Sequence, residues 1–255
     1  INGIHLTAEG YLKLAPAILS DKLFAPLPDG APLEAIRPEV LEKNDTFFDW
    51  YRTVNSFYIH GDRKNPYGTV NFPLERNKLL QMTSLRDQRI WSAARGDKLP
   101  PEIDDSSTVK IPTTRPGKRG GTSPALSPIK ERAKFEIAEG FQVELFASEE
   151  EFPELRNPVA IKFDAAGRLW VATMPSYPHA LPGVKTNDQI LILEDTDQDG
   201  KADKRTIFAE NLYLPLGFEF GEDGIFLSQE PNLVFLRDTD DDGKADQETI
   251  LLHGF

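Results

Sequence analysis

The chain contains no cysteine. It therefore forms no disulfide, and within these residues it has no thiolate-bound zinc, no thiol nucleophile and no covalently attached c-type haem. Long apolar runs are missing too, because the longest is far shorter than the roughly 20 residues that cross a bilayer as a helix. We therefore expect no transmembrane segment in this chain.

Basic residues are in short supply. The 255 residues include 29 Lys and Arg against 41 Asp and Glu, which gives a formal net charge of −12. A surface this acidic repels phosphate backbones, so we expect no nucleic-acid partner and regard cations as the more natural ligands. The chain also begins at Ile1, without an initiator methionine or a signal peptide. We expect it to be a fragment of a longer, multidomain protein.

Residues 1–96 show helical periodicity. Thr7 suits the N-cap of a first helix, and Pro38 suits the first turn of a second. A third helix is predicted over residues 74–95, ending at Gly96. Residues 97–134 differ in kind, because Pro, Gly, Ser and Thr account for 17 of the 31 residues from 100 to 130 and few large apolar side chains could anchor them. This composition predicts a linker.

From residue 135 to residue 255 the apolar period changes to two, as in half-buried strands. One strand is expected over residues 141–145. Two hairpins are predicted, with turns at residues 164–167 and 221–224, and each is followed by two more strands. The sequence thus predicts a four-stranded unit that occurs twice.

Each unit carries an acidic loop, and the two loops begin 43 residues apart, at Asp195 and Asp238. Four short strands at this spacing are typical of β-propeller blades. The predicted fold is therefore a helical tail, a linker, and the first two blades of an incomplete all-β propeller. A β-sandwich is the alternative, ranked lower because it has no reason to repeat loop chemistry at blade spacing.

The acidic loops share the pattern Asp-Thr-Asp-x-Asp-Gly-Lys-Ala-Asp. Carboxylates at positions 1, 3 and 5 with glycine at position 6 fold a loop around a hard cation, and the carbonyl at position 7 can point inward. The candidate ligands are four aspartates and the lysine carbonyl of each loop: Asp195, Asp197, Asp199, Lys201 and Asp203, then Asp238, Asp240, Asp242, Lys244 and Asp246.

An EF-hand has a glutamate at position 12 of the loop, where this chain has Thr206 and Thr249. We therefore predict EF-like loops on a β scaffold, closed by the aspartate at position 9 and binding structural Ca²⁺. The alternative is that Asp and Gly are simply favourable turn residues. Against it, four carboxylates within nine residues repel one another unless a cation neutralises them.

A histidine near the start is a candidate catalytic base. His5 lies in the stretch Asn2-Gly-Ile-His5-Leu-Thr-Ala-Glu-Gly-Tyr, at the mouth of the first predicted helix. Taken by itself, a single histidine in a turn is more often a surface residue. Residues 1–19 resemble the last block of SGNH (GDSL-type) hydrolases, an Asp-x-x-His before a helix. The resemblance implies that His5 is the base and residues 1–96 the end of such a domain, although Asn2 replaces the family's aspartate.

Residues 135–255 resemble the β-propeller of the "membrane-bound dehydrogenase" proteins of planctomycetes and their relatives, which are similar to soluble quinoprotein glucose/sorbosone dehydrogenases. The stretches that carry the resemblance are Gly140-Phe-Gln-Val-Glu-Leu-Phe, Asn157-Pro-Val-Ala-Ile, Gly167-Arg-Leu-Trp-Val-Ala and the two acidic loops. It implies a six-bladed propeller in an exported, periplasmic oxidoreductase that acts on carbohydrates. Pyrroloquinoline quinone and a haem c electron acceptor would belong to the longer protein, and this chain alone would be inactive.

A second class of function stays open. Integrin-type propellers carry similar acidic loops, so the β region is alternatively a calcium-stabilised binding or adhesion module without catalysis. One more residue is of interest. His179 lies in a Pro- and Gly-rich insertion between predicted strands, where loops can line a pocket, although an ordinary loop histidine is the more frequent case.

Overall fold

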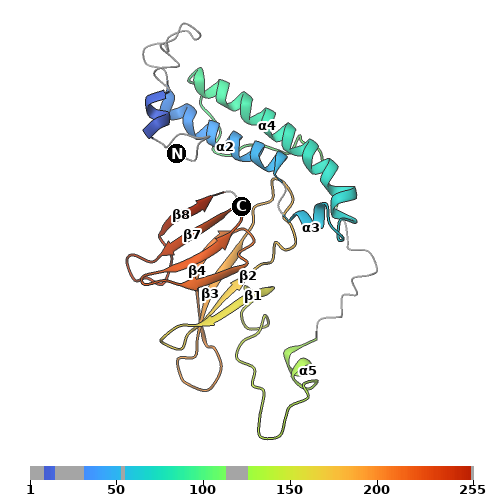
Figure 1. Ribbon diagram of the computed structural model, residues 1–255, viewed down its shortest axis with the longest axis vertical. Coiled ribbons are helices and arrows are strands. Elements are labelled where there is room, and N and C mark those ends of the chain that lie inside the picture. The colour runs from blue at the N-terminus through green and yellow to red at the C-terminus, as the bar shows by residue number, and fades with distance from the viewer. Residues whose placement is uncertain (1–8, 15–31, 53–54, 113–125, 254–255) are drawn as a thin grey trace. The chain divides into compact units, whose positions relative to one another are not determined.

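The computed structural model describes residues 9–14, 32–52, 55–112 and 126–253 (Figure 1). The chain divides into two compact units, residues 1–48 with 80–107 and residues 49–79 with 108–255. No helix in the described ranges is long and apolar enough to cross a membrane. His5 and the N-cap residue Thr7 lie outside the described residues.

Two long helices dominate the helical region. They are α2 (Leu33–Tyr51) and α4 (Phe72–Ala94). The prediction for α4 is confirmed within two residues, and Gly96 ends it with a φ of 78°, a conformation that glycine adopts without strain. The prediction for Pro38 was wrong. Pro38 lies inside α2, where it lacks the N–H that would donate to the preceding turn.

Short helical segments complete this region. A single turn, α3 (Ser56–Ile59), leads to a wide turn, η1 (Tyr67–Asn71), which runs directly into α4. The short helix α5 (Pro128–Arg132) precedes the β region.

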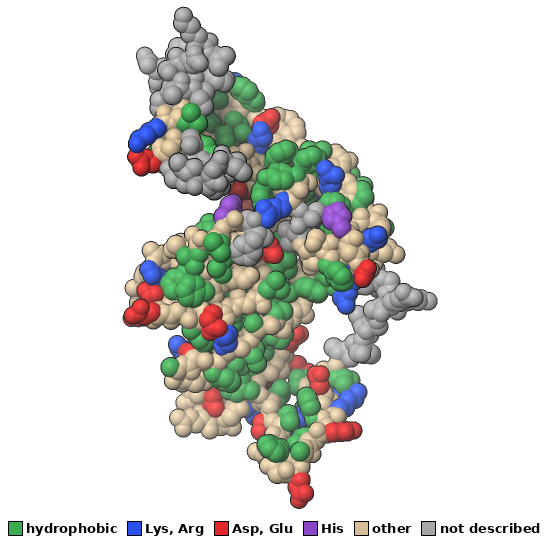
Figure 2. Space-filling model, in the orientation of Figure 1, with side chains coloured by type: hydrophobic (Ala, Val, Ile, Leu, Met, Phe, Trp, Pro, Cys, Tyr) green, Lys and Arg blue, Asp and Glu red, His purple; other side chains and the backbone are tan. Residues whose placement is uncertain are grey.

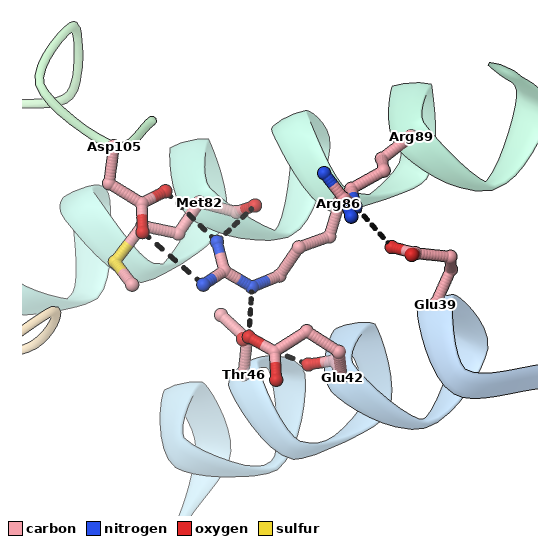
Figure 3. A network of polar contacts seen from close by, with 7 residues as sticks. All are labelled: Glu39, Glu42, Thr46, Met82, Arg86, Arg89 and Asp105. Carbon is pink, nitrogen blue, oxygen red and sulfur yellow. Dashed lines mark hydrogen bonds and ion pairs between the residues drawn. The ribbon is translucent and has the colours of Figure 1, made fainter. Parts of the chain in front are cut away.

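In the first unit, ion pairs join α2 to α4 (Figure 3). The Arg86 guanidinium is 6% exposed; it binds both carboxylate oxygens of Asp105, at 2.9 and 3.2 Å, and its Nε donates to Glu42 at 3.0 Å. Arg89 pairs with Glu39 in the same way. The partners of α4 run backward along α2, so the two helices are antiparallel.

The β region of the second unit consists of two four-stranded antiparallel sheets, ordered β1-β2-β3-β4 and β5-β6-β7-β8 (Figure 1). The strands of the first sheet are β1 (Pro158–Phe163), β2 (Leu169–Thr173), β3 (Asp188–Glu194) and β4 (Lys204–Leu212). Those of the second are β5 (Gly217–Phe220), β6 (Ile225–Gln229), β7 (Asn232–Arg237) and β8 (Gln247–His253). Both predicted hairpins and both following strand pairs are present.

The two sheets share one hydrophobic core. Trp170 and Phe208 from the first sheet pack with their rings 4.7 Å apart, and Trp170 also meets Phe220 of the second sheet edge-on at 5.3 Å. Buried residues from both sheets, among them Ile192 and Leu227, belong to the same cluster. Burial of these aromatic and branched side chains is the main force that holds the sheets together.

The predicted fold class was wrong. The described residues form a pair of long helices and, as a separate part, two four-stranded sheets that share one core, with no closed barrel among them. The alternation of apolar residues and the 43-residue repeat specify a four-stranded unit. The alternation and the repeat do not specify how many units pack together or whether they close into a ring. The propeller prediction assumed both.

The strand expected over residues 141–145 was also wrong. This segment has no strand partner, and Phe141 is 78% exposed. The neighbouring Phe146 and Leu155 instead pack against a second small core around Leu191 and Leu193. Alternation indicates a strand only where a neighbour completes its hydrogen bonds.

Candidate functional site

Both acidic loops occupy the same place in their sheets. The first, residues 195–203, connects β3 to β4, and the second, residues 238–246, connects β7 to β8. Each is therefore the link between the last two strands of a four-stranded unit. The repeat in the sequence is a repeat in the structure at this point.

The two loops have the same backbone conformation. In the first, Asp195 accepts hydrogen bonds from the N–H groups of Asp199 at 3.2 Å and Gly200 at 2.9 Å. In the second, Asp238 accepts from Asp242 at 3.2 Å and Gly243 at 2.8 Å. The first aspartate thus folds the loop back on itself in both copies.

Positive φ angles also recur at positions 4 and 6. They are 63° at Gln198 and 89° at Gly200, and 61° at Asp241 and 88° at Gly243. Glycine at position 6 meets this requirement without strain. The sharp turn predicted from the glycine at position 6 of both loops agrees with this geometry.

The aspartate at position 9 fastens the end of each loop to its beginning. Asp203 accepts hydrogen bonds from the N–H of Thr196 at 3.1 Å and from its hydroxyl at 2.8 Å. Asp246 accepts from the N–H of Thr239 at 3.1 Å and from its hydroxyl at 2.7 Å. The threonine at position 2 therefore holds the loop closed, and its repetition in both loops was the sequence signal for this contact.

Three carboxylates converge in each loop. One oxygen each from Asp195, Asp197 and Asp203 lie within 4.8 Å of one another, and the second loop brings Asp238, Asp240 and Asp242 equally close. Asp199 and Asp246, also predicted as ligands, are outside these two trios. Asp199 and Asp242 each accept a hydrogen bond from the N–H of the following lysine, Lys201 or Lys244, at 2.9 and 2.8 Å.

The donor set suits a hard cation. It consists of carboxylate oxygens on a short loop with partly or fully exposed side chains, which is the ligand type that Ca²⁺ and Mg²⁺ take. The residues present therefore fit a calcium ion.

Each loop also forms a joint with a neighbouring segment through the alanine at position 8. The N–H of Ala202 donates to the carbonyl of Phe146 at 2.8 Å, and the N–H of Ala245 donates to the carbonyl of Phe208, in β4, at 2.7 Å. The second loop therefore connects the second sheet to the first. Ala202 also belongs to the small core around Leu191, and Ala245 packs against the core that the two sheets share. A change in the conformation of either loop should therefore disturb the packing of its core.

A second polar group lies apart from the loops. His179, in the insertion between β2 and β3, has its Nε2 2.7 Å from Oε2 of Glu75 in the first turn of α4. Both residues line a cavity of about 240 Å³. His179 was a candidate from its place in the insertion, whereas Glu75 gave no signal in the sequence, because an acidic residue is common in the first turn of a helix.

Comparison with known proteins gives one match. Residues 127–255 match a family described as "Domain of unknown function (DUF7133)". No curated protein and no solved structure matches the chain.

Proposed function

The chain belongs to the DUF7133 family, and we propose that it is a calcium-stabilised binding module in which each acidic loop holds one Ca²⁺. The observation that carries the proposal is that the two loops, which connect equivalent strands of their sheets, each bring three carboxylates within 4.8 Å, at positions 1, 3 and 9 in the first loop and 1, 3 and 5 in the second. The proposed ion stabilises the connection between the last two strands of each sheet.

Electrostatics favours a cation over an empty loop. Two unit charges about 4 Å apart repel by roughly 1 kcal/mol in water and about 4 kcal/mol near a protein surface. Three carboxylates at this spacing oppose the loop conformation, whereas one bound Ca²⁺ turns the repulsion into attraction. Because the second loop also joins the two sheets through Ala245, and the first loop bonds to the carbonyl of Phe146 through Ala202, the stabilisation extends from the loops to the β region.

Calcium titration of the chelator-treated chain by calorimetry tests the proposal. We expect two bound Ca²⁺ per chain, and one in Asp197→Asn or Asp240→Asn, because these aspartates belong to the converging trios. Asp241→Asn is the matched control. It removes an equal charge from the second loop at a position outside the trio, and asparagine tolerates its φ of 61°.

Calcium should also raise the free energy of unfolding of the β region, by about 2.7 kcal/mol for each bound ion when free Ca²⁺ is a hundred times its dissociation constant. Equal calcium binding by Asp240→Asn and Asp241→Asn would contradict the assignment of ligands. An unchanged melting temperature in calcium and in chelator would contradict the proposal itself.

A redox role is the second candidate. It is favoured by the resemblance of residues 140–171 and of the acidic loops to exported quinoprotein dehydrogenases that act on carbohydrates. In that case the quinone, the haem acceptor and the substrate site involve the longer, periplasmic protein. The test is whether that full-length protein, supplied with pyrroloquinoline quinone and a sugar, reduces a dye acceptor.

A further inference from the structure

The cavity beside Glu75 and His179 lies within the second unit. Apolar side chains form much of its wall, including Ile59, Leu79 and Leu181. Its volume of about 240 Å³ exceeds the roughly 150 Å³ that hold a benzene molecule and lies below the pockets of drug-sized ligands. The space therefore suits a compact molecule of five to ten heavy atoms, as an order of magnitude.

The polar end of this cavity is incompletely satisfied. Glu75 is 2% exposed, and His179 occupies only its Oε2 oxygen. The other oxygen, Oε1, is buried and has no hydrogen-bond partner among the described residues. Buried carboxylates are normally hydrogen-bonded at both oxygens, because an unmet acceptor loses its hydration without replacement.

The Nδ1 atom of His179 also lacks a hydrogen-bond partner among the described residues. When Nε2–H donates to the Glu75 carboxylate, the neutral ring keeps its lone pair on Nδ1. Nδ1 is also buried without a partner in the described part of the chain. Glu75 and His179 thus each leave one buried acceptor without a donor in the described part of the chain.

The surrounding charges are mostly negative. Asp49 lines the cavity with Glu75, and Arg52 is the basic residue of the lining. The pKa of the Tyr213 hydroxyl, also in the wall, is raised, first by burial and then by the nearby carboxylates of Asp49, Glu230 and Glu75. An acidic field in a partly apolar space selects a ligand that is positively charged and has an aliphatic body.

We propose that this cavity binds a small primary amine, whose ammonium group donates to Oε1 of Glu75 and whose aliphatic part packs on the apolar wall. An ammonium group has three donors and neutralises the carboxylate, so it supplies the hydrogen-bond donor that Oε1 of Glu75 lacks. Since Oε1 and Nδ1 are sealed beneath the surface, the His179 ring, 12% exposed on its loop, turns to admit the ligand. The proposed site shares no residue with the acidic loops, so it stands independently of the calcium proposal.

The test is a titration of the full chain with butylammonium, followed by the imidazole ¹⁵N resonances of its four histidines. His179 is assigned from the signal missing in His179→Asn. We expect a saturable shift of the His179 resonances, and binding at least tenfold weaker in Glu75→Gln, because a hydrogen bond to a charged acceptor is replaced by a neutral one. Glutamine retains an acceptor for Nε2–H, so the variant should fold.

Matched probes and variants make the result specific. Butanol has the same aliphatic chain without the charge and should bind at least tenfold more weakly, and butyrate should not bind. Thr186→Val changes an uncharged residue of the same wall and should bind butylammonium within about threefold of the wild type. Absence of a saturable shift, an equal response to butanol, or full binding by Glu75→Gln would each overturn the proposal.

A lysine side chain of another protein has the same ammonium chemistry. A blocked Gly-Lys-Gly peptide serves as the probe for that source. We expect it to bind no more tightly than butylammonium, because the cavity has room for little beyond the side chain. Clearly tighter binding of the peptide would overturn the assignment to a free small amine.

Discussion

The indole Nε1 of Trp170 donates a hydrogen bond to Oδ2 of Asp164 at 2.9 Å, across the turn between β1 and β2. The same carboxylate accepts from the backbone N–H groups of Ala166 and Arg168, both at 2.9 Å, and pairs with the Arg168 side chain at 2.7 Å. Asp164 thus shapes the first hairpin turn and fixes the orientation of a core aromatic residue. Since Trp170 packs against both sheets, this contact couples turn geometry to the shared core.

Asp164→Ala should lower the free energy of unfolding by about 2–3 kcal/mol. The change leaves a buried indole N–H and two turn N–H groups without their acceptor, and each unmet buried group loses its hydration. Urea denaturation followed by tryptophan fluorescence measures the loss. Asp223→Ala, in the corresponding turn of the second sheet, is the control and should cost less than about 1 kcal/mol, because Asp223 is exposed and its ion pair with Arg237 lies at the surface. Equal losses in the two variants would contradict this role of Asp164.

Asp164 should also contribute to acid sensitivity. Burial alone would raise the pKa of its carboxyl, but hydrogen bonds from Trp170 and Arg168 outweigh burial and lower it below the ordinary value. A lowered folded-state pKa contributes stability above the unfolded value near 3.9, and that stability is lost as the pH falls through the folded value. Asp164→Asn should therefore flatten the stability curve below about pH 4 and leave its shape near pH 7 unchanged. If the stability of the variant and of the wild type fell equally below about pH 4, the pKa of Asp164 would not be lowered in the folded state.

Local patterns sufficed for much of the β region. The hairpin turns, the buried run from Ile190 to Leu193 and the acidic loops depend on neighbouring residues, and the structure places them as expected. The alternation of apolar and polar residues from Phe141 wrongly predicted a strand, because a strand also needs a partner with which to form hydrogen bonds. The fold class failed for a similar reason, since the packing of the two sheets depends on contacts such as that of Trp170 with Phe220.

The cavity beside Glu75 and His179 could not be predicted from local sequence patterns. Glu75 and His179 are separated by 104 residues and come together only through tertiary structure. A glutamate in a first helical turn is common because it complements the helix dipole, so its position carries no signal of a site. Chemistry that one loop supplies can be predicted from its sequence, whereas a pair that two distant segments supply cannot.

Removing one partner from the ion pairs around Arg86 should destabilise the α2–α4 pair. Asp105→Ala should cost about 3 kcal/mol, because it leaves a buried guanidinium without its two-point partner. In the double variant with Arg86→Met, much of the loss should be recovered, since no buried charge remains unpaired. Urea denaturation followed by circular dichroism at 222 nm reports on the helices. Asp87→Ala, which removes the 53% exposed partner of Lys43, is the control and should cost at most about 1 kcal/mol. A double variant no more stable than Asp105→Ala would rule out this account.

The last strand should promote self-association. Every residue of β8 is exposed, with Ile250, Leu251 and Leu252 at 52%, 44% and 58%, and β8 pairs only with β7 within the described part of the chain. Figure 2 shows hydrophobic side chains on the surface in this part of the molecule. An exposed apolar edge strand offers unpaired backbone groups and an apolar surface to a second copy.

Leu252→Lys should weaken this association at least tenfold, because a charged side chain on an edge strand opposes pairing. Sedimentation velocity over a range of protein concentrations measures the effect. Ile129→Lys, which adds the same charge at a 79% exposed position in α5, should leave association unchanged. Added salt should strengthen association of the wild type, because it screens the net charge of −12 over about 10 Å at 0.1 M. A wild-type chain that stays monomeric at every salt concentration would show that β8 is not an association edge.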